Sequence, residues 1–560
     1  MEKGPEASRP PTGDISAVET DVEAPRISTH TETPVLPTWR LVCVCISVSF
    51  GLFLSLLDTT IVATALYTIG VDLKSLGSIN WVALAYTLSY LGCAVIFSRI
   101  ADIFGRRNAY IAAFLIFFAF SLGCGFSTSL TQLIACRTLQ GVGGSGLYSL
   151  TFVILPEISP PKLIQAIGAM AGAVVAMAGV LGPVLGGLIT HYTTWKWIFW
   201  INAPIGVGPL ILFIIAWPKP NQLRPARRRP LKELDIIGAI LVITASVLMV
   251  FSFQNAGLKS NAWKQAIFIA PLLIGCLCAA GLVGWEYLVA YSWEGRLATM
   301  FPLRLMKRRV YMGCVATALL GGFPYFVVIY ALPLRLQVVN EKSALLAGVS
   351  LLPMLGAVAV ASALGGVIHK KRERIFATLL AGSLFTVIGS ACLSTLDNTV
   401  HAPAKMYGFE VFVGLGFGLM VSTVSLGAMI EADAQDKTVA QGVVAQARVF
   451  GGSIGIAAST AILGAMQRSE LSGIVTPEQL CTLQTSTRTM TPAQLHAVRQ
   501  AYSDSFSEVM KVCAAISAAC VVACALAYRR HGVDLQARRE EQMREEDEMA
   551  RVAAESNESS

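Results

Sequence analysis

Fourteen apolar runs of about 18 to 27 residues follow one another between Arg40 and Arg530. Each run is long enough to cross a hydrocarbon core about 30 Å thick at a rise of about 1.5 Å per residue. Only 14% of the residues are charged, whereas a soluble chain carries about a quarter. So many runs leave little chain outside a bilayer. The sequence therefore predicts an all-α membrane protein that either moves something across the bilayer or senses something within it.

The orientation of the spans follows from the Lys and Arg residues between them. These residues cluster in alternate loops, at 99–107, 224–232, 304–309 and 370–374, and basic loops stay on the cytoplasmic side. An even number of spans then places both termini in the cytoplasm and the long loop 467–505 outside, where residues 492–502 are expected to form a short surface helix. The predicted spans are residues 41–66, 79–97, 109–126, 130–155, 163–189, 197–217, 236–253, 266–288, 310–332, 345–368, 375–396, 406–430, 443–466 and 506–528.

An internal repeat relates the two ends of the chain. A polar residue precedes a Gly-x-Gly pair by four positions in the fourth span and again in the twelfth, as Arg137, Gly141, Gly143 and as Glu410, Gly414, Gly416. Self-similarity of this kind indicates duplicated halves. The predicted organisation is a disordered cytoplasmic tail at 1–38, a six-helix bundle at 39–217, a basic loop at 218–234, two inserted helices at 235–290, a basic loop at 291–309, a second six-helix bundle at 310–530 and a charged cytoplasmic tail at 531–560.

Three ionisable residues inside spans are candidates for function. A charge within a membrane span is costly and marks a functional site by default. Asp58 lies in the first span, Arg137 in the fourth and Glu410 in the twelfth. A carboxyl group in a low-dielectric cavity can take up and release a proton. The alternatives are that Asp58 pairs or caps structurally, and that Arg137 or Glu410 reaches the outer surface.

Two glycine-containing segments carry further patterns. The loop from Ser98 to Arg107 contains Asp102, Gly105, Arg106 and Arg107; Gly105 permits a tight turn, and Asp102 can pair with a neighbouring Arg and latch one conformation. The alternative is a plain basic loop. The fifth span contains small residues that allow close helix contact, with a proline that allows a bend: Gly172, Gly179, Gly182, Pro183, Gly186 and Gly187.

These segments resemble the major facilitator superfamily. The loop is similar to its signature loop, with Ser98 where the family has Gly, and the fifth span resembles the motif of its drug:proton antiporters. Residues 57–66 are similar to the first-span signature of the fourteen-span antiporters, with Tyr67 where that family has Pro. The resemblance covers about 39–530 and is closest to fungal efflux pumps for toxins and other secondary metabolites. It implies a proton-coupling role for Arg137.

The sequence and the resemblance together predict a major facilitator fold with two six-helix halves and two inserted helices. The expected function is proton-coupled export of a small amphipathic organic compound by alternating access, with Asp58 as proton carrier, Arg137 biasing its charge and Glu410 as a weaker candidate. We expect a monomer in the plasma membrane, with a vacuolar membrane as the alternative. Polar or aromatic residues within spans are the candidate cavity lining: Tyr86, Tyr90, Tyr148, Gln254, Phe326 and Gln337.

Other functions remain open or are disfavoured by the sequence. Related fourteen-span carriers import basic amino acids or iron chelates, and a membrane sensor without transport is a further alternative. The sequence has no Gly-rich phosphate loop ending in Lys-Ser or Lys-Thr, so ATP is not the expected energy source. The six His residues are scattered, so we expect no metal, no cofactor and no enzyme activity. The net charge of +8 lies in loops without a basic aromatic patch, which argues against nucleic acid.

Overall fold

The computed structural model describes residues 37–73, 79–159, 164–218, 231–256, 264–292, 297, 299–369, 374–399, 402–433, 436–474, 490–530, 537–538, 541–542 and 544–545. Within these residues every regular element is a helix. The expected disordered segment at the N-terminus lies almost entirely outside them. The helices are α1 Thr38–Asp72, α2 Asn80–Phe104, α3 Arg106–Phe126, α4 Leu130–Ile158, α5 Ile164–Tyr192, α6 Trp197–Trp200, α7 Asn202–Ala216, η3 Leu231–Glu233, α8 Ile236–Ala256, α9 Ala266–Ser292, α10 Leu303–Met306, α11 Arg309–Val338, α12 Ala344–Val349, α13 Leu352–Ile368, α14 Ile375–Leu393, α15 Lys405–Glu431, α16 Lys437–Glu470, α19 Pro492–Cys524 and η7 Ala525–Ala527.

The count of membrane spans agrees with the prediction. Thirteen segments of the described chain are long and apolar enough to cross a bilayer. They do not include α4, which is 29 residues long and contains Arg137, Gln140 and Glu157. Because α4 packs against α1, α2 and α3 along the bundle, it is the fourteenth long helix.

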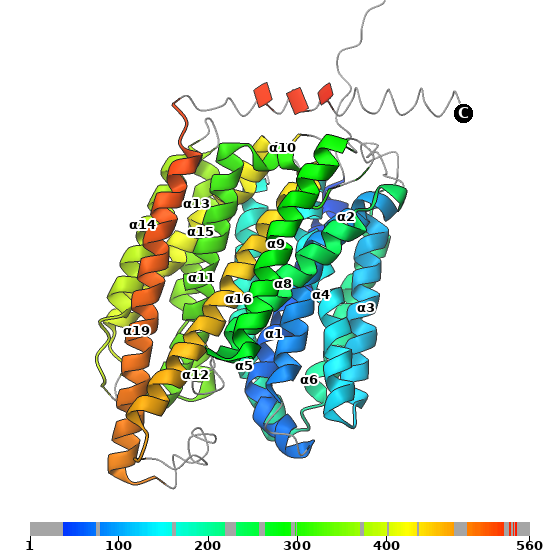
Figure 1. Ribbon diagram of the computed structural model, residues 1–560. Helices are drawn as coiled ribbons and strands as arrows, with labels where there is room; N and C mark the ends of the chain where they lie inside the picture. Colours follow the sequence, from blue (N-terminus) through cyan, green and yellow to red (C-terminus); the bar gives the residue numbers. More distant parts are fainter. Residues whose placement is uncertain are drawn as a thin grey trace, which may run out of the picture. The chain divides into compact units, whose positions relative to one another are not determined.

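The two halves repeat the same packing. In the first half α4 packs against α2 and α3, while α5 packs against α1. In the second half α15 packs against α13 and α14, while α16 packs against α11. Contacts between the halves are paired in the same way, since α5 meets α13 and α16 meets α2 (Figure 1). This pattern confirms the expected fold of two related six-helix halves.

The glycines of the repeat occupy matching places. A Cβ on Gly141 would approach the Tyr86 backbone of α2, at 3.1 Å from its Cα, and one on Gly414 would meet the Met354 backbone of α13, at 3.0 Å from its carbonyl carbon. Gly143 likewise abuts α3, and Gly416 abuts α14. The spacing seen in the sequence is therefore a packing requirement, because only glycine lets these helix backbones approach so closely.

The inserted helices bridge the halves. α8 packs against α9, and it also contacts α2 of the first half and α16 of the second (Figure 1). Asp235 caps α8 by accepting from the Gly238 N–H at 2.7 Å, and it accepts from Trp285 of α9 at 2.9 Å. These bonds hold the two inserted helices together at the end that carries the basic loops.

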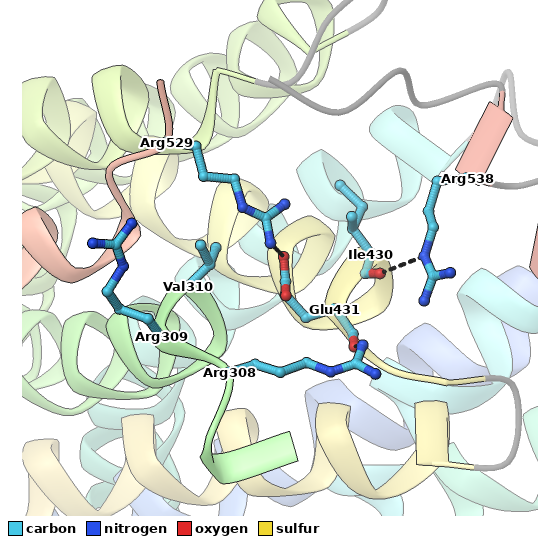
Figure 2. A pocket seen from close by; sticks show the side chains of 7 residues that line it. All are labelled: Arg308, Arg309, Val310, Ile430, Glu431, Arg529 and Arg538. Atoms are coloured by element: carbon cyan, nitrogen blue, oxygen red, sulfur yellow. Dashed lines mark hydrogen bonds and ion pairs between the residues drawn. The ribbon is translucent and has the colours of Figure 1, made fainter. Parts of the chain in front are cut away.

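The structure differs from the prediction near the C-terminus. The separate surface helix expected at 492–502 is wrong, because Pro492 to Cys524 form one continuous helix that begins with a complete capping box at Thr491. The charged tail also packs against the bundle where it is described. Arg538 donates to the Ile430 carbonyl at 3.3 Å (Figure 2). The largely buried Gln542 donates to the Met429 carbonyl at 3.0 Å. These two side chains satisfy carbonyl groups that the end of α15 leaves open.

Candidate proton and substrate site

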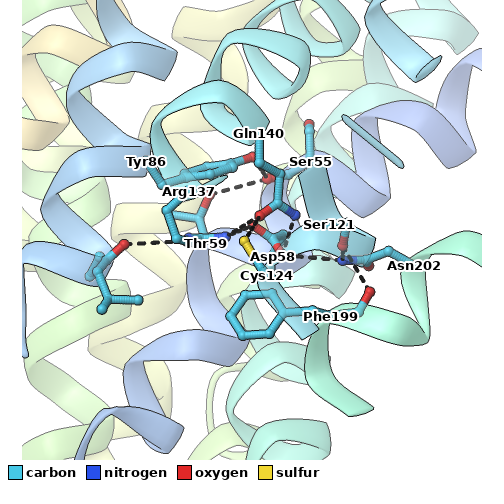
Figure 3. A network of polar contacts seen from close by, with 12 residues as sticks. Ser55, Asp58, Thr59, Tyr86, Ser121, Cys124, Arg137, Gln140, Phe199 and Asn202 are labelled. Atoms are coloured by element: carbon cyan, nitrogen blue, oxygen red, sulfur yellow. Dashed lines mark hydrogen bonds and ion pairs between the residues drawn. The ribbon is translucent and has the colours of Figure 1, made fainter. Parts of the chain in front are cut away.

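Asp58 lies at the centre of a buried polar network in the first half (Figure 3). Its side chain is fully buried and forms an ion pair with Arg137 of α4. Its other oxygen accepts from the Gln140 amide at 3.0 Å and from the Asn202 amide at 3.2 Å. One carboxylate of α1 thus receives donors from both α4 and α7.

Arg137 does not reach the membrane surface. Its side chain is 1% exposed and also donates to the Val82 carbonyl of α2 at 3.2 Å and to Gln140 at 2.9 Å. The guanidinium carbon lies 4.2 Å from the centre of the Tyr86 ring. Arg137 therefore connects α1, α2 and α4, and the alternative of a snorkelling Arg is wrong.

Local sequence explains how three helices come so close. Gly141 and Gly144 of α4 leave room for Tyr86 on α2, whose hydroxyl donates to the Ser55 carbonyl of α1 at 2.8 Å. Asn202 is the first residue of α7, and its amide also donates to Ser121 of α3 at 3.0 Å. Glycine packing and cross-helix hydrogen bonds thus position the carboxylate without a loop.

An aromatic row leads away from this network. Tyr86 stacks on Tyr90 with ring centres 5.6 Å apart, Tyr90 lies 5.6 Å from Tyr148, and Tyr148 lies 5.1 Å from Phe152. At the far end is Arg448 of α16, whose guanidinium carbon lies 5.5 Å from the Phe152 ring and which interacts with Tyr148. The row therefore runs from Arg137 to the interface with the second half, and it brings together three of the six predicted cavity residues.

The other three predicted cavity residues lie elsewhere. Phe326 of α11 contacts Tyr325 edge to face at 5.5 Å and packs on Gly452 of α16. Gln254 is partly buried on the inserted helix α8. Gln337 donates to the Pro333 carbonyl of its own helix at 3.3 Å. None of their contacts within the described chain joins the aromatic row.

Glu410 lies apart from the Asp58 network. It is fully buried in α15, and neither carboxylate oxygen has a hydrogen-bond partner among the described residues. Lys342 is the cation in electrostatic reach, and its ammonium group is held by Ser350 at 3.2 Å and by Tyr407 at 3.1 Å. Glu410 mirrors Arg137 in the repeat, but the structure does not bring the two residues into one site.

The signature loop joins the two halves. Gly105 separates α2 from α3 with φ of 85°, a conformation that favours glycine. Arg106 then pairs with Asp102 at 2.9 Å and with Glu157 of α4 at 3.1 Å, and it donates to Thr438 of α16 at 2.7 Å. Arg107 is partly exposed beside it. The geometry is that of a latch between the first half and α16.

The small residues of α5 face two directions. A Cβ on Gly172 would touch Ser362 and Val358 of α13, both at 3.4 Å, and one on Gly179 would touch Ile329 of α11 at 3.7 Å. Gly182 instead abuts Thr60 and Ile61 of α1. The close helix contact expected from this motif therefore reaches the second half at Gly172 and Gly179 and stays within the first half at Gly182. Gly187 has open space, while Gly186 is buried and Pro183 lies within the helix.

Sequence reasoning missed several residues of these sites. Gln140 and Asn202 complete the Asp58 network, Thr438 completes the latch, and Arg448 is 4% exposed between the halves. A signal existed for Arg448, since it is a charge inside a predicted span. No local signal marks Thr438, because its role depends on a partner 332 positions away.

Comparisons with known proteins agree with this architecture. A sequence profile described as Major Facilitator Superfamily matches residues 48–456. The chain is 31% identical over 504 residues to the "MFS-type transporter FPY5" of Fusarium mangiferae, covering 88% of this chain and 84% of that protein. It is 28% identical to the "Efflux pump roqT" of Penicillium rubens, with 90% and 94% covered, and 26% identical to the "Rubrofusarin-specific efflux pump aurT" of Gibberella zeae, with 77% and 78% covered.

Solved structures share the fold. The human organic anion transporter MFSD10 superimposes with a TM-score of 0.53 at 14% identity, covering 85% of this chain and 99% of that one. A bacterial homologue of the lysosomal transporter Spinster gives a TM-score of 0.51, also at 14% identity, with 88% and 96% covered. On its sequence match and its helix arrangement, this multi-pass membrane protein belongs to the Major Facilitator Superfamily.

Proposed function

We propose that the protein exports a small amphipathic organic compound from the cytoplasm in exchange for protons. The observation that carries the proposal is the Asp58–Arg137 pair, a titratable ion pair buried at the junction of α1, α2 and α4. Relatives named as efflux pumps, among them one specific for rubrofusarin and one described as an aspyridones efflux protein, support export of a secondary metabolite. We propose the plasma membrane as its location, with both termini in the cytoplasm.

Proton exchange at Asp58 requires the ion pair to separate. In the structure Arg137 and the amides of Gln140 and Asn202 all donate to the carboxylate. A proton that arrives on Asp58 removes the charge that holds Arg137, and the guanidinium then keeps its bond to the Val82 carbonyl of α2. Protonation would therefore shift the contacts between α1 and α2 in favour of a second arrangement.

The aromatic row connects the Asp58–Arg137 pair with the region where we place the substrate. Arg137 rests on Tyr86, the first ring of the row that ends beside Arg448 of the second half. A displacement of Arg137 would change the surroundings of Tyr86 and, through stacked contacts, those of Tyr90 and Tyr148. Apolar and aromatic side chains with a few polar groups are what a pocket for an amphipathic compound requires. We therefore place substrate binding along this row, between the halves.

Transport in proteoliposomes tests the proposal. The purified protein would be reconstituted with a fluorescent amphipathic probe such as rhodamine 6G, and an imposed pH gradient should drive probe movement that a protonophore abolishes. Asp58→Asn should lose the proton-driven component, since the amide cannot release a proton. Because this variant leaves Arg137 buried without its counter-ion, its rate is compared at equal amounts of folded, monodisperse protein. Proton-driven movement by Asp58→Asn at the wild-type rate would overturn the assignment of the carrier, and probe movement unaffected by the gradient in the wild type would overturn proton coupling.

The isolated carboxyl of Glu410 provides a matched comparison. If Glu410 binds and releases transported protons together with Asp58, Glu410→Gln should reduce the transport rate and shift the pH optimum of transport. An unchanged pH profile would leave Asp58 as the single carboxylate of the coupling step. Asn398→Asp is a suitable control, because it adds a carboxyl to a partly exposed position outside both sites.

A further inference from the structure

An arginine-lined pocket lies at the end of the second half where α11 begins and α15 ends (Figure 2). Its volume is about 470 Å³, within the range of about 300–1,000 Å³ typical of ligand pockets. Four guanidinium groups and one carboxylate give its lining a net charge of +3. The lining residues are Arg308, Arg309, Val310, Ile430, Glu431, Arg529 and Arg538.

The arginines differ in how far they are already neutralised. Arg529 pairs with Glu431 at 2.6 Å, and Arg308 pairs with Asp433 at 2.7 Å. Arg538 shares Asp433 at 3.6 Å and also pairs with Glu541 at 2.7 Å. Arg538 also lies 3.7 Å from Glu545. These carboxylates offset the charge of the three arginines and hold their side chains in place, so the positive charge available to a ligand is that of Arg309.

Arg309 is the arginine most available to a ligand. It donates to the Tyr528 carbonyl at 2.6 Å, and within the described part of the chain no carboxylate lies at ion-pair distance from it. A guanidinium group has five N–H donors in a planar fork that matches a phosphate or carboxylate group. Most of those donors remain for an anion in the pocket.

The backbone adds to the positive potential. Arg308 is the N-cap of α11, which is 30 residues long, and its side chain makes no capping hydrogen bond. The first N–H groups of a helix and its macrodipole both favour an anion at this end. The pocket therefore combines a helix N-terminus with arginine side chains, and both favour the binding of an anion.

Exposed apolar side chains lie on the segment that leads into Arg529 of the pocket lining. Val522 in the last turn of α19 is 74% exposed, and Leu526 in η7 is 42% exposed. Tyr528, which accepts from Arg309, is 52% exposed. An anion that also carries an acyl chain could thus place its charged group among the arginines and its chain against this surface.

We propose that this pocket binds the phosphate-bearing headgroup of an anionic phospholipid. The proposed orientation places this end of the bundle at the cytoplasmic leaflet, where anionic lipids gather and basic pockets between spans bind phosphorylated headgroups. The adjoining apolar surface favours a lipid over free phosphate, although both offer the same phosphate chemistry. The bound headgroup would join the start of α11 to the end of the last span. This site is independent of the Asp58 network and of the transported compound.

Lipid binding to the full-length protein in detergent micelles tests the proposal. The probes are acyl-labelled phosphatidylinositol, phosphatidylserine and phosphatidylcholine, followed by fluorescence anisotropy. The two anionic lipids should bind at least tenfold more tightly than phosphatidylcholine. Arg309→Gln should weaken their binding about fivefold, since one cationic contact at a membrane surface is worth about that factor, and Arg309→Glu should weaken it further. Lys307→Gln is the matched control, because Lys307 is exposed in the same loop and does not line the pocket.

Two further arms separate the possible outcomes. Inorganic phosphate and inositol phosphate are added as soluble competitors, and Arg529→Lys keeps a charge opposite Glu431 while removing the planar fork, so that it should fold and still lose affinity. Equal binding of phosphatidylcholine, or wild-type affinity in Arg309→Glu, would overturn the site. Tight binding of the soluble phosphates with no gain from the acyl chains would overturn the lipid assignment in favour of a soluble anion.

Discussion

Asp58 and Arg137 illustrate how two charged residues can be buried in membrane spans when they pair with each other. Either charge alone in a membrane span would be unfavourable, and in the structure each is buried against the other with amide donors around the carboxylate. Such a pair is weak evidence for stability, although breaking it leaves an uncompensated buried charge. At this scale the sequence named both residues, and the structure added Gln140, Asn202 and Tyr86 as their partners.

Removing one partner of this pair should lower the free energy of unfolding more than removing both. Arg137→Gln leaves Asp58 buried without its cation, and we expect a loss of about 3–5 kcal/mol in folding free energy. The double variant Asp58→Asn/Arg137→Gln should recover much of that loss, because two amides can hydrogen-bond without a net charge. Thermal unfolding of the purified variants in detergent measures the difference. Equal destabilisation by the single and double variants would contradict a coupled pair.

A buried histidine outside the spans should make stability depend on pH. His369 follows α13, is 3% exposed, and contacts Thr423 at 3.2 Å through Nε2 while Nδ1 accepts from the Arg374 N–H at 3.3 Å. Burial, with a smaller effect of Arg374, lowers the pKa of His369 to about 4. The folded state therefore holds the neutral ring, and its stabilising contribution is complete above the unfolded pKa of about 6.5 and falls as the pH drops toward 4.

The expected effect at pH 5 is a loss of about 2 kcal/mol relative to pH 7.5. His369→Gln should remove this pH-dependent term while keeping a polar group beside Thr423. Unfolding temperatures of both proteins between pH 7.5 and 5 provide the measurement. His496→Gln serves as the control, since His496 is exposed near the start of α19. An identical pH slope in wild type and His369→Gln would show that His369 is not the group responsible.

At the scale of elements, α5 shows that one glycine motif can serve two interfaces. Gly172 and Gly179 contact helices of the second half, whereas Gly182 contacts α1 of its own half. Thr60 of α1 donates to the Ala178 carbonyl of α5 at 3.1 Å, which ties the two helices together beside Gly182. The motif therefore keeps α5 bound to its own half while it also touches the other.

Alanine substitutions at different glycines of α5 should differ sharply in their effect on stability. A Cβ at Gly182 would overlap the Thr60 side chain and lie 3.1 Å from the Ile61 nitrogen, so Gly182→Ala should destabilise the first half by about 1–3 kcal/mol. Gly187→Ala should be neutral, because nothing lies within 4 Å of its added atom. Thr60→Ala should partly rescue Gly182→Ala. Unfolding temperature in detergent and transport in proteoliposomes report on both variants, and equal behaviour of the two alanines would refute the packing argument.

At the scale of the whole molecule, the two halves meet at the end that carries the signature loop. Arg106 of the first half donates to Thr438 of α16, and α2 and α16 lie so close that a Cβ on Gly442 would be 3.1 Å from the Ser98 Cβ. Gly442 is thus opposite the serine that stands where the family signature has glycine. The alternating-access cycle that we propose requires this end to open, so it predicts that these contacts break in each cycle.

A disulfide across this contact should stop transport. Ser98→Cys with Gly442→Cys places two Cβ atoms 3.1 Å apart, somewhat closer than the about 3.5–4.5 Å found in disulfides, so a slight separation of α2 and α16 allows the bond to form. In a background without reactive native cysteines, oxidation should abolish probe transport and reduction should restore it. Each single cysteine variant should transport under both conditions. Undiminished transport after verified cross-linking would mean that this end does not open during the cycle.

The sequence by itself determined the number of spans, the two halves with their insertion, and the charged residues Asp58 and Arg137 within them. These properties are local, because hydropathy over one span decides whether that segment enters a bilayer. The repeat was also visible, since close packing against two neighbours requires the same glycine spacing in α4 and α15.

The tertiary structure decided which of these residues meet. Asp58 and Arg137 are 79 positions apart, and Arg106 and Thr438 are 332 positions apart. The packing of the helices also decides that Gly182 lies away from the interface between the halves and that Glu410 lies outside the Asp58 network. Side-chain partners depend on how helices rotate and cross, and those angles are set by many contacts at once. Hydropathy brings each helix into the membrane, while the partners of its charged residues are fixed only when all the helices pack.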